Sequence, residues 1–374
     1  MKSVQNGNLA KLVAFFAIAI TIACTVSFAA NGWQSFIPEP DSDNVASDEN
    51  SDNNNVDENT DGDTTNKDED IPVVAPTPKY YHYLTGLETD LESSMKKPLC
   101  LILSSQDPLY GISSSYLTIE FPIEHGDTRL MCFTDTAQTL GKIGSLAPSR
   151  GYISNFATYF GGVLLSYGND DTFEYEYYMP NNELDFKNTT GYCYTEYNTL
   201  VYTNGDLISA FLNNSRINTV VYGSTILPFD FNQVDASPLL GDNYATNIVI
   251  RYSESNSTEL VYSSIEGKYY FSKNSTGKSD LLNDKILAYD NIFVLYADST
   301  THETADSTQM ILNTTDGGKG VYISNGRRTD ITWIRDVSGN LCFFDDEGEK
   351  LVINRGSSYI AFSKSSNEAL IKIS

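Results

Sequence analysis

A chain of 374 residues with 24 basic and 49 acidic side chains carries a formal net charge of −25 at pH 7. This charge argues against nucleic acid as a partner, because a phosphate backbone is bound mainly through Lys and Arg. The five cysteines form no C-x-x-C pair, which argues against a zinc knuckle or a thioredoxin-like site.

The N-terminus carries an apolar segment from Leu12 to Ala30 that contains no charge. A helix of this length spans roughly 28 Å, close to the thickness of a bilayer's hydrocarbon core. Lys2 and Lys11 precede the segment, and the next basic residue is Lys67. The positive-inside rule therefore predicts a cytoplasmic N-terminus over residues 1–11, a single-pass transmembrane anchor or signal sequence over 12–30, and extracytoplasmic domains in the cell membrane.

Two other interpretations of this segment stay open beside the anchor. The stretch TIAC could be a lipobox with lipid on Cys24, although Thr21 stands where an aliphatic residue is usual. A signal peptide could instead be cut after Ser27–Ala29, which has the small-x-small pattern. All three interpretations export residues 31–374.

An acidic linker is predicted over residues 31–78. From Glu39 to Asp70 there are 13 acidic residues and one lysine, so this stretch carries −12 of the formal charge. Aliphatic residues are sparse, and no core could offset the entropy of ordering the chain. We expect a disordered, self-repelling tether that ends in the Pro-stiffened IPVVAPTPKYY.

Residues 79–240 are predicted as a first domain of α/β type. Pro98–Leu103, Tyr116–Phe121 and Thr128–Phe133 indicate strands. Ser149–Phe160 has apolar residues near helical spacing and is followed by Gly161-Gly162, which ends a helix. A further strand over Gly162–Gly168 and a second helix beginning near Asp206 complete the mixed pattern.

Residues 241–374 are predicted as an all-β domain, a sandwich or an open barrel, which makes the whole chain α+β. Short β-rich runs are followed by a meander from Gly320 to Gly356. Asn325-Gly326 suits a two-residue hairpin turn, because both residues tolerate positive φ. We expect the apolar residues of the meander to share inward faces, namely Val321, Ile323, Ile331, Trp333, Cys342 and Phe344.

No metal site and no cofactor are predicted. The three histidines do not lie within ligand spacing of one another, and no nucleophile elbow or phosphate-binding loop occurs. Cys100 and Cys132 lie in apolar strand-like runs, where buried thiols are expected and a disulfide stays open as an alternative.

The stretch IEFPIEHGDTRLMCF, Ile119 to Phe133, is the most suggestive polar feature. Glu120 and Glu124 lie on either side of Pro122 and could converge as an acid and base pair. The simpler interpretation is a hairpin in which Glu124 pairs with Arg129 and the charges are structural. The residues alone favour the hairpin.

The chain resembles the YerB-like lipoprotein family, two-domain bacterial envelope proteins of unknown function. The resemblance is carried by YGISSSYLTIEFPIEHGDTRLMCF and IGSLAPSRGYISNFA, and by NIVIRYS, DNIFVLYA, GGKGVYISNGR and FFDDEGEKLVINRGSSYI in the same order. It covers roughly residues 80–374. It implies a polar signature that falls on Glu120, Glu124, Gly126, Thr128, Arg129 and Arg150.

Three departures from the family pattern bear on function. A second arginine near the helix is replaced around Ala147, a histidine with paired glycines by Ser166–Asp170, and a Pro-His element is missing before Asn291. These losses favour a membrane-anchored extracytoplasmic binding or structural module with an envelope or cell-wall ligand. The alternative is a cell-envelope hydrolase that uses Glu120 and Glu124, with Arg129 and Arg150 holding an anionic group.

Overall fold

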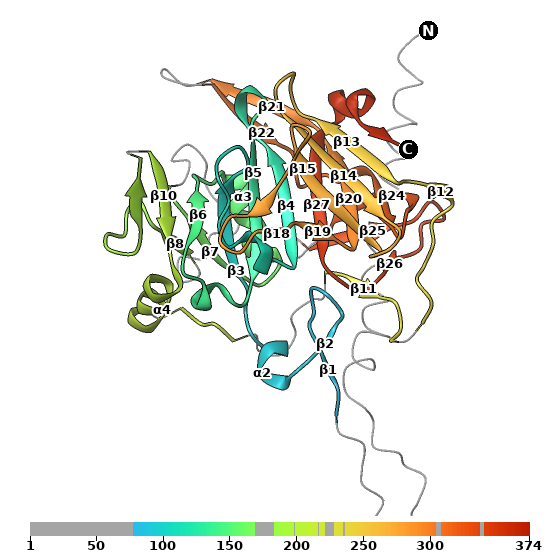
Figure 1. Cartoon of the computed structure of the whole chain (residues 1–374). Helices are drawn as coiled ribbons and strands as arrows, with labels where there is room; N and C mark the ends of the chain where they lie inside the picture. The colour runs from blue at the N-terminus through green and yellow to red at the C-terminus, as the bar shows by residue number, and fades with distance from the viewer. Residues whose placement is uncertain are drawn as a thin grey trace, which may run out of the picture. The chain divides into compact units, whose positions relative to one another are not determined.

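The computed structural model describes residues 78–168, 183–197, 199–215, 217–220, 228–234, 236–303, 308–336 and 340–374 (Figure 1). The predicted membrane segment, Cys24 and almost all of the acidic linker lie outside these residues. In the described ranges, no helix is long and apolar enough to cross a membrane. Residues Tyr81–Ser374 form one compact unit.

A large mixed sheet organises this unit, with 14 strands in the described residues. Its main path runs through β12 (Asn243–Tyr244), β24 (Arg327–Arg335), β23 (Gly318–Ser324), β20 (Asn291–Ala297), β27 (Ser358–Lys364), β4 (Leu117–Pro122), β5 (Thr128–Thr134), β3 (Leu99–Ser104), β6 (Ile143–Leu146), β10 (Leu200–Thr203) and β9 (Tyr194–Glu196). Three strands pair off this path, namely β25 (Leu341–Phe344), β7 (Val163–Ser166) and β8 (Glu183–Asp185). The strand β27 lies parallel to both β20 and β4, so it joins the two halves of the chain.

A second sheet is smaller and comes from the C-terminal half. It contains β16 (Thr276–Gly277), β15 (Lys268–Lys273), β14 (Ser257–Ser263), β13 (Asn247–Arg251), β28 (Lys372–Ile373) and β19 (Ala288–Tyr289). Short pairs are formed by β1 (Tyr80–Tyr81) with β2 (Glu88–Thr89), β11 (Asp230–Phe231) with β26 (Val352–Ile353), β17 (Ser279–Asp280) with β18 (Lys285–Ile286), and β21 (Ser299–Glu303) with β22 (Thr308–Leu312).

The large sheet is covered on both faces, because alternate residues of its strands enter two different cores. In β20, Ile292 and Val294 pack with residues of β13, β14 and β15 in the second sheet, whereas Phe293 and Leu295 pack in the core that contains α3 (Gly151–Tyr159). Every residue of β20 is buried. This explains why its sequence, NIFVLYA, is an unbroken apolar run rather than an alternating one.

The two predicted helices are present and are fixed by local signals. The helix α3 is followed by Gly161 at φ 67°, the left-handed conformation that ends many helices. The helix α4 (Gly205–Asn214) begins after Asn204, whose side chain accepts a hydrogen bond from the Leu207 amide at 2.9 Å. Other helical turns are α2 (Leu91–Ser94), η1 (Ile112–Ser114), η2 (Glu124–Gly126), η3 (Ala137–Thr139) and η4 (Ser365–Leu370).

The fold is thus mostly β with few helices, and its sheets are not closed into a barrel. The expected α/β character of residues 79–240 is weaker than predicted, since strands dominate this segment too. The boundary at residue 240 stays a prediction, while strands from both sides of it share the large sheet. Cys100 and Cys132 are free, buried thiols, and they enter different cores.

Candidate functional site

The stretch singled out from the sequence folds as a hairpin of β4 and β5 connected by the turn η2. Pro122 ends β4 and pairs with Thr128 at the start of β5. His125 and Gly126 have positive φ values of 58° and 77°, which closes the turn tightly. A Cβ on Gly126 would lie 2.5 Å from the Cβ of Ser253, so only glycine fits there.

The carboxylate of Glu120 is fully buried between the two sheets. It accepts hydrogen bonds from four hydroxyl groups and from the ammonium of Lys273 on β15. The hydroxyl donors are Thr128 at 2.6 Å, Thr258 at 2.7 Å, Tyr252 at 3.1 Å and Tyr359. Burial raises the pKa of this carboxyl, but Lys273 and the hydroxyl donors outweigh it, and the pKa lies below its usual value.

Lys273 is as completely enclosed as Glu120, with a side chain that is 1% exposed. Its ammonium also donates to the hydroxyl groups of Thr258 at 3.0 Å and Thr128 at 3.2 Å. All three of its donors are therefore used, and the two charges cancel inside the protein. Burial lowers the pKa of Lys273, and the attraction of Glu120 opposes that effect.

The carboxylate of Glu124 lies on the other side of the large sheet, at the beginning of α3. Its two oxygens accept a fork of hydrogen bonds from Arg150, Nε at 3.1 Å and Nη2 at 2.8 Å. The backbone N–H of Met310 adds a third bond at 3.2 Å. Burial raises the pKa of Glu124, but the bonds from Arg150 and the backbone outweigh it and lower the pKa.

Arg129 lies near this pair but does not join it. Its Nη1 donates to the carbonyl of Thr128 at 3.3 Å, and its Nε is buried without a hydrogen-bond partner among the described residues. The pKa of Arg129 is lowered, mainly by burial and secondly by the positive charge of Arg150. Glu124 thus accepts its fork of hydrogen bonds from Arg150, and not from Arg129 as the hairpin interpretation expected.

The predicted residues therefore form two separate groups. Glu120 and Thr128 belong to the cluster with Lys273, and Glu124 and Arg150 form an ion pair next to Arg129. The carboxylates of Glu120 and Glu124 do not converge, because one binds partners of the second sheet and the other binds the start of α3. Among the described residues, no cluster of His, Cys, Asp and Glu could hold a metal ion.

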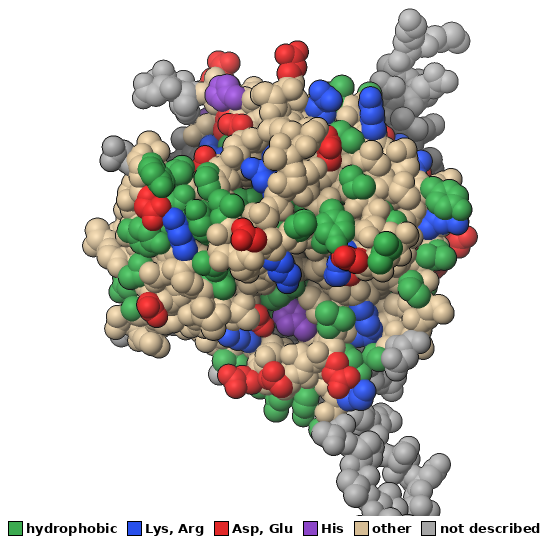
Figure 2. Space-filling model, in the orientation of Figure 1, with side chains coloured by type: hydrophobic (Ala, Val, Ile, Leu, Met, Phe, Trp, Pro, Cys, Tyr) green, Lys and Arg blue, Asp and Glu red, His purple; other side chains and the backbone are tan. Residues whose placement is uncertain are grey.

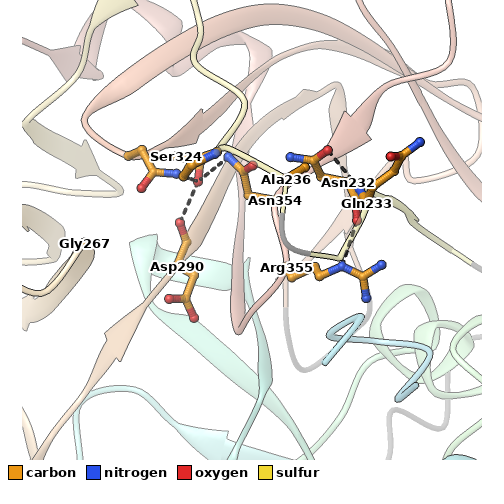
Figure 3. A pocket seen from close by; sticks show the side chains of 10 residues that line it. Asn232, Gln233, Ala236, Gly267, Asp290, Ser324, Asn354 and Arg355 are labelled. Atoms are coloured by element: carbon orange, nitrogen blue, oxygen red, sulfur yellow. Dashed lines mark hydrogen bonds between the residues drawn. The ribbon is translucent and has the colours of Figure 1, made fainter. Parts of the chain in front are cut away.

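The structure also contains a polar pocket of about 230 Å³ that the sequence did not reveal. Segments far apart in the chain meet there, and Figure 3 shows Asp290, Ser324 and Asn354 opposite Asn232, Gln233 and Arg355. The other lining residues are Ala236, Pro238, Gly267 and Asn325. Two sequence signals mark this site in retrospect, the turn SNG before Arg327 and the stretch INRG at Ile353–Gly356.

The carboxylate of Asp290, on one side of the pocket, is fixed by hydrogen bonds from Lys268 and Ser357. Lys268 binds both oxygens of Asp290, at 2.7 and 2.8 Å, and the backbone N–H and hydroxyl of Ser357 bind one of them at 2.7 and 2.8 Å. Gly356 has φ 128°, and a Cβ there would lie 2.4 Å from Cγ of Asp290. The close approach of this loop to Asp290 therefore depends on glycine.

The opposite wall is held by Asn354 and Arg355. The side chain of Asn354 bonds both backbone groups of Leu239, at 2.7 and 2.9 Å, and the hydroxyl of Ser324 at 3.2 Å. Arg355 donates from Nε to the carbonyl of Asn232 at 2.7 Å and from Nη1 to the carbonyl of Gly86. The pocket is thus built from groups that are fixed before any ligand arrives.

Comparisons with known proteins give a family domain and a fold. Residues 248–360 match the C-terminal domain of DUF3048, described as a protein of unknown function. The crystal structure of the YerB protein from Bacillus subtilis is similar with a TM-score of 0.66 at 18% identity, over 79% of this chain and 100% of that chain. A search of the curated proteins found no match.

Proposed function

We propose that this chain, whose resemblance to the YerB-like family of unknown function is confirmed by its DUF3048 domain and its fold, is a membrane-anchored extracytoplasmic binding module of the bacterial cell envelope. The uncharged segment over residues 12–30 and the acidic linker after it support the anchored, extracytoplasmic part of this proposal. The chemistry of the described residues supports binding.

The observation that carries the proposal is the state of the two candidate carboxylates. A general acid or base must reach a substrate proton, yet Glu120 has no exposed surface and its oxygens accept five hydrogen bonds. Glu124 is held by the fork from Arg150. A hydrolase that used this pair would first have to break both ion pairs, whereas a binding module needs neither carboxylate to be free.

The surface also bears on the class of partner. In the view of Figure 2, basic and acidic side chains are interspersed over the visible face. This face offers no continuous basic stripe of the kind that binds a phosphate backbone. An envelope glycan or peptide therefore suits the protein better than nucleic acid does.

One experiment separates the binding module from the hydrolase. The full chain, purified in detergent, is mixed with purified bacterial cell walls, and both pelleting with the walls and release of soluble fragments are measured. We expect pelleting without release, unchanged by Glu124→Gln and by the control Glu254→Gln at an exposed position. Release that only Glu124→Gln abolishes would support the hydrolase, and absence of pelleting would refute the binding module.

The anchor is tested by the mass of the protein isolated from membranes. An intact N-terminus corresponds to an uncleaved anchor, a chain that begins with lipidated Cys24 to a lipoprotein, and a chain that begins after Ala29 to a cleaved signal peptide. We expect the intact mass and resistance to extraction at alkaline pH. Digestion of residues 31–374 by protease added to cells with a permeable wall would confirm the extracytoplasmic side.

A further inference from the structure

The pocket between Asp290 and Arg355 has the size of a small polar ligand. Its space is about 230 Å³, enough for several water molecules. Pockets for drug-sized molecules are larger, on the order of 300–1,000 Å³. A single sugar ring with its substituents is the scale of ligand that fits.

The lining selects for hydrogen bonding. Amide, hydroxyl, carboxylate and guanidinium groups dominate it, and Ala236 and Pro238 are the only apolar side chains among the described lining residues. In the part of the chain that the structure describes, no aromatic side chain lines the pocket to stack on a base or an apolar ring. A ligand rich in hydroxyl and amide groups would satisfy these donors and acceptors, whereas an apolar ligand would leave them unpaired.

The charges of the pocket are not balanced. Asp290 is neutralised by the ion pair with Lys268. Arg355, in contrast, contacts the carbonyls of Asn232 and Gly86 and the ring of Tyr81, which are all neutral. Among the described residues, its Nη2 has no hydrogen-bond partner. With respect to the described residues, Arg355 is therefore a guanidinium without an acidic partner, and this group is well suited to a carboxylate.

One side chain of the pocket, that of Gln233, can bind a ligand without giving up hydrogen bonds that stabilise the fold. Gln233 is exposed, and its side-chain amide makes no hydrogen bond with the described residues, while its backbone N–H donates to Asn232 at 2.9 Å. Because Asn354 fixes the neighbouring loop at Leu239, Gln233 is presented from an ordered wall. An amide in this setting can donate to one ligand hydroxyl and accept from the next.

We propose that this pocket binds one carboxylate-bearing sugar unit, with the carboxylate on Arg355 and the hydroxyl or acetamido groups on Gln233 and Asn325. The proposal rests on the proposed function as an envelope-binding module and names the ligand class that the module recognises. Glycans of the envelope that carry uronic acids or lactyl-substituted amino sugars contain such units.

The test compares pairs of sugars that differ in the carboxylate. Glucuronic acid is titrated against glucose, and N-acetylmuramic acid against N-acetylglucosamine, into the full chain in detergent by calorimetry or ligand-observed NMR. We expect each acidic sugar to bind at least about tenfold more tightly than its neutral counterpart, the size of one good charge-assisted hydrogen-bond contact. Equal affinities, or no binding of any of the four sugars, would overturn the proposal.

Two variants and a control locate the binding. Arg355→Gln should abolish the difference between acidic and neutral sugars, and the matched control Arg251→Gln, at an exposed position outside the pocket, should preserve it. Arg355 also holds two backbone carbonyls, so Gln233→Leu, which breaks no internal bond, provides a second test and should weaken all bound sugars. Unchanged affinity in Gln233→Leu would place the sugars elsewhere and overturn the proposal.

The cell-wall experiment keeps the two proposals distinguishable. If the chain pellets with cell walls but binds none of the four sugars, the binding module stands and the pocket assignment falls. If it neither pellets nor binds sugars, both proposals fall.

Discussion

Replacing Lys273 by Met should destabilise the folded protein more than replacing an exposed lysine does. The Glu120 carboxylate then stays buried without its counter-charge. Breaking a buried ion pair in this way typically costs about 3–5 kcal/mol. Here the four hydroxyl donors remain on the carboxylate. We therefore expect the lower end of that range, about 3 kcal/mol, or a decrease in Tm of about 6 °C for a chain of this size.

The assay is thermal unfolding of the full chain at pH 7, followed by near-ultraviolet circular dichroism. Lys285→Met, at an exposed position, is the matched control and should change Tm by about 1 °C or less. The double variant Glu120→Gln with Lys273→Met removes both charges and should be more stable than Lys273→Met alone. If Lys273→Met has the same Tm as the control, or the double variant is no more stable than Lys273→Met, then the buried ion pair does not stabilise the fold.

Three further predictions concern the rest of the site. The pKa of Glu124 is lowered in the folded state, so its contribution to stability is present above the ordinary carboxyl pKa of about 4.3 and is lost as the pH falls through the lower folded pKa. Below about pH 4, Tm should therefore fall less steeply in Glu124→Gln than in the wild type. Equal slopes would contradict this prediction. Arg150→Met leaves Glu124 only the Met310 amide among these partners and should cost about 2 kcal/mol in urea unfolding, and Arg150→Lys should not restore it fully because one ammonium cannot form the fork. Gly356→Ala places a Cβ 2.4 Å from Cγ of Asp290 at φ 128°, so we expect a loss of about 2 kcal/mol together with weaker sugar binding, and an unperturbed Tm would refute the close packing.

Local features of this fold were predictable because their causes lie within a few residues. The hairpin of β4 and β5, the helix α3 and the Asn325-Gly326 turn all follow from short patterns, and the turn has the expected positive φ values of 51° and 73°. The resemblance to the YerB-like family also follows from the sequence, and the DUF3048 match and the similar fold confirm it.

The register of the meander distributes its inward-facing residues over both faces of the large sheet. A two-residue turn at Asn325-Gly326 pairs Ser324 with Arg327 and therefore Val321 with Asp330. Val321 and Ile331 consequently enter different cores, although both are buried. Because both faces of the large sheet are covered, the meander has two inward faces.

The partners of the candidate residues were not predictable, because they are set by pairing over long distances in the sequence. Lys273 meets Glu120 across 153 positions, and no local pattern marks that lysine as buried. The pocket likewise depends on bringing Asn232, Asp290 and Arg355 together. A single sequence records which residues are polar, but not which of them the sheet order makes neighbours.

The position of β27 has a consequence for how the chain can be made. This strand spans Ser358–Lys364, close to the C-terminus, yet it lies between β20 and β4 and pairs with both. Until β27 has been synthesised, β4 and β20 each keep an unpaired edge, and such edges are prone to association with other chains. A chain truncated before Ser358 therefore lacks the middle of its large sheet rather than an edge, and we expect it to aggregate instead of folding into a shortened domain.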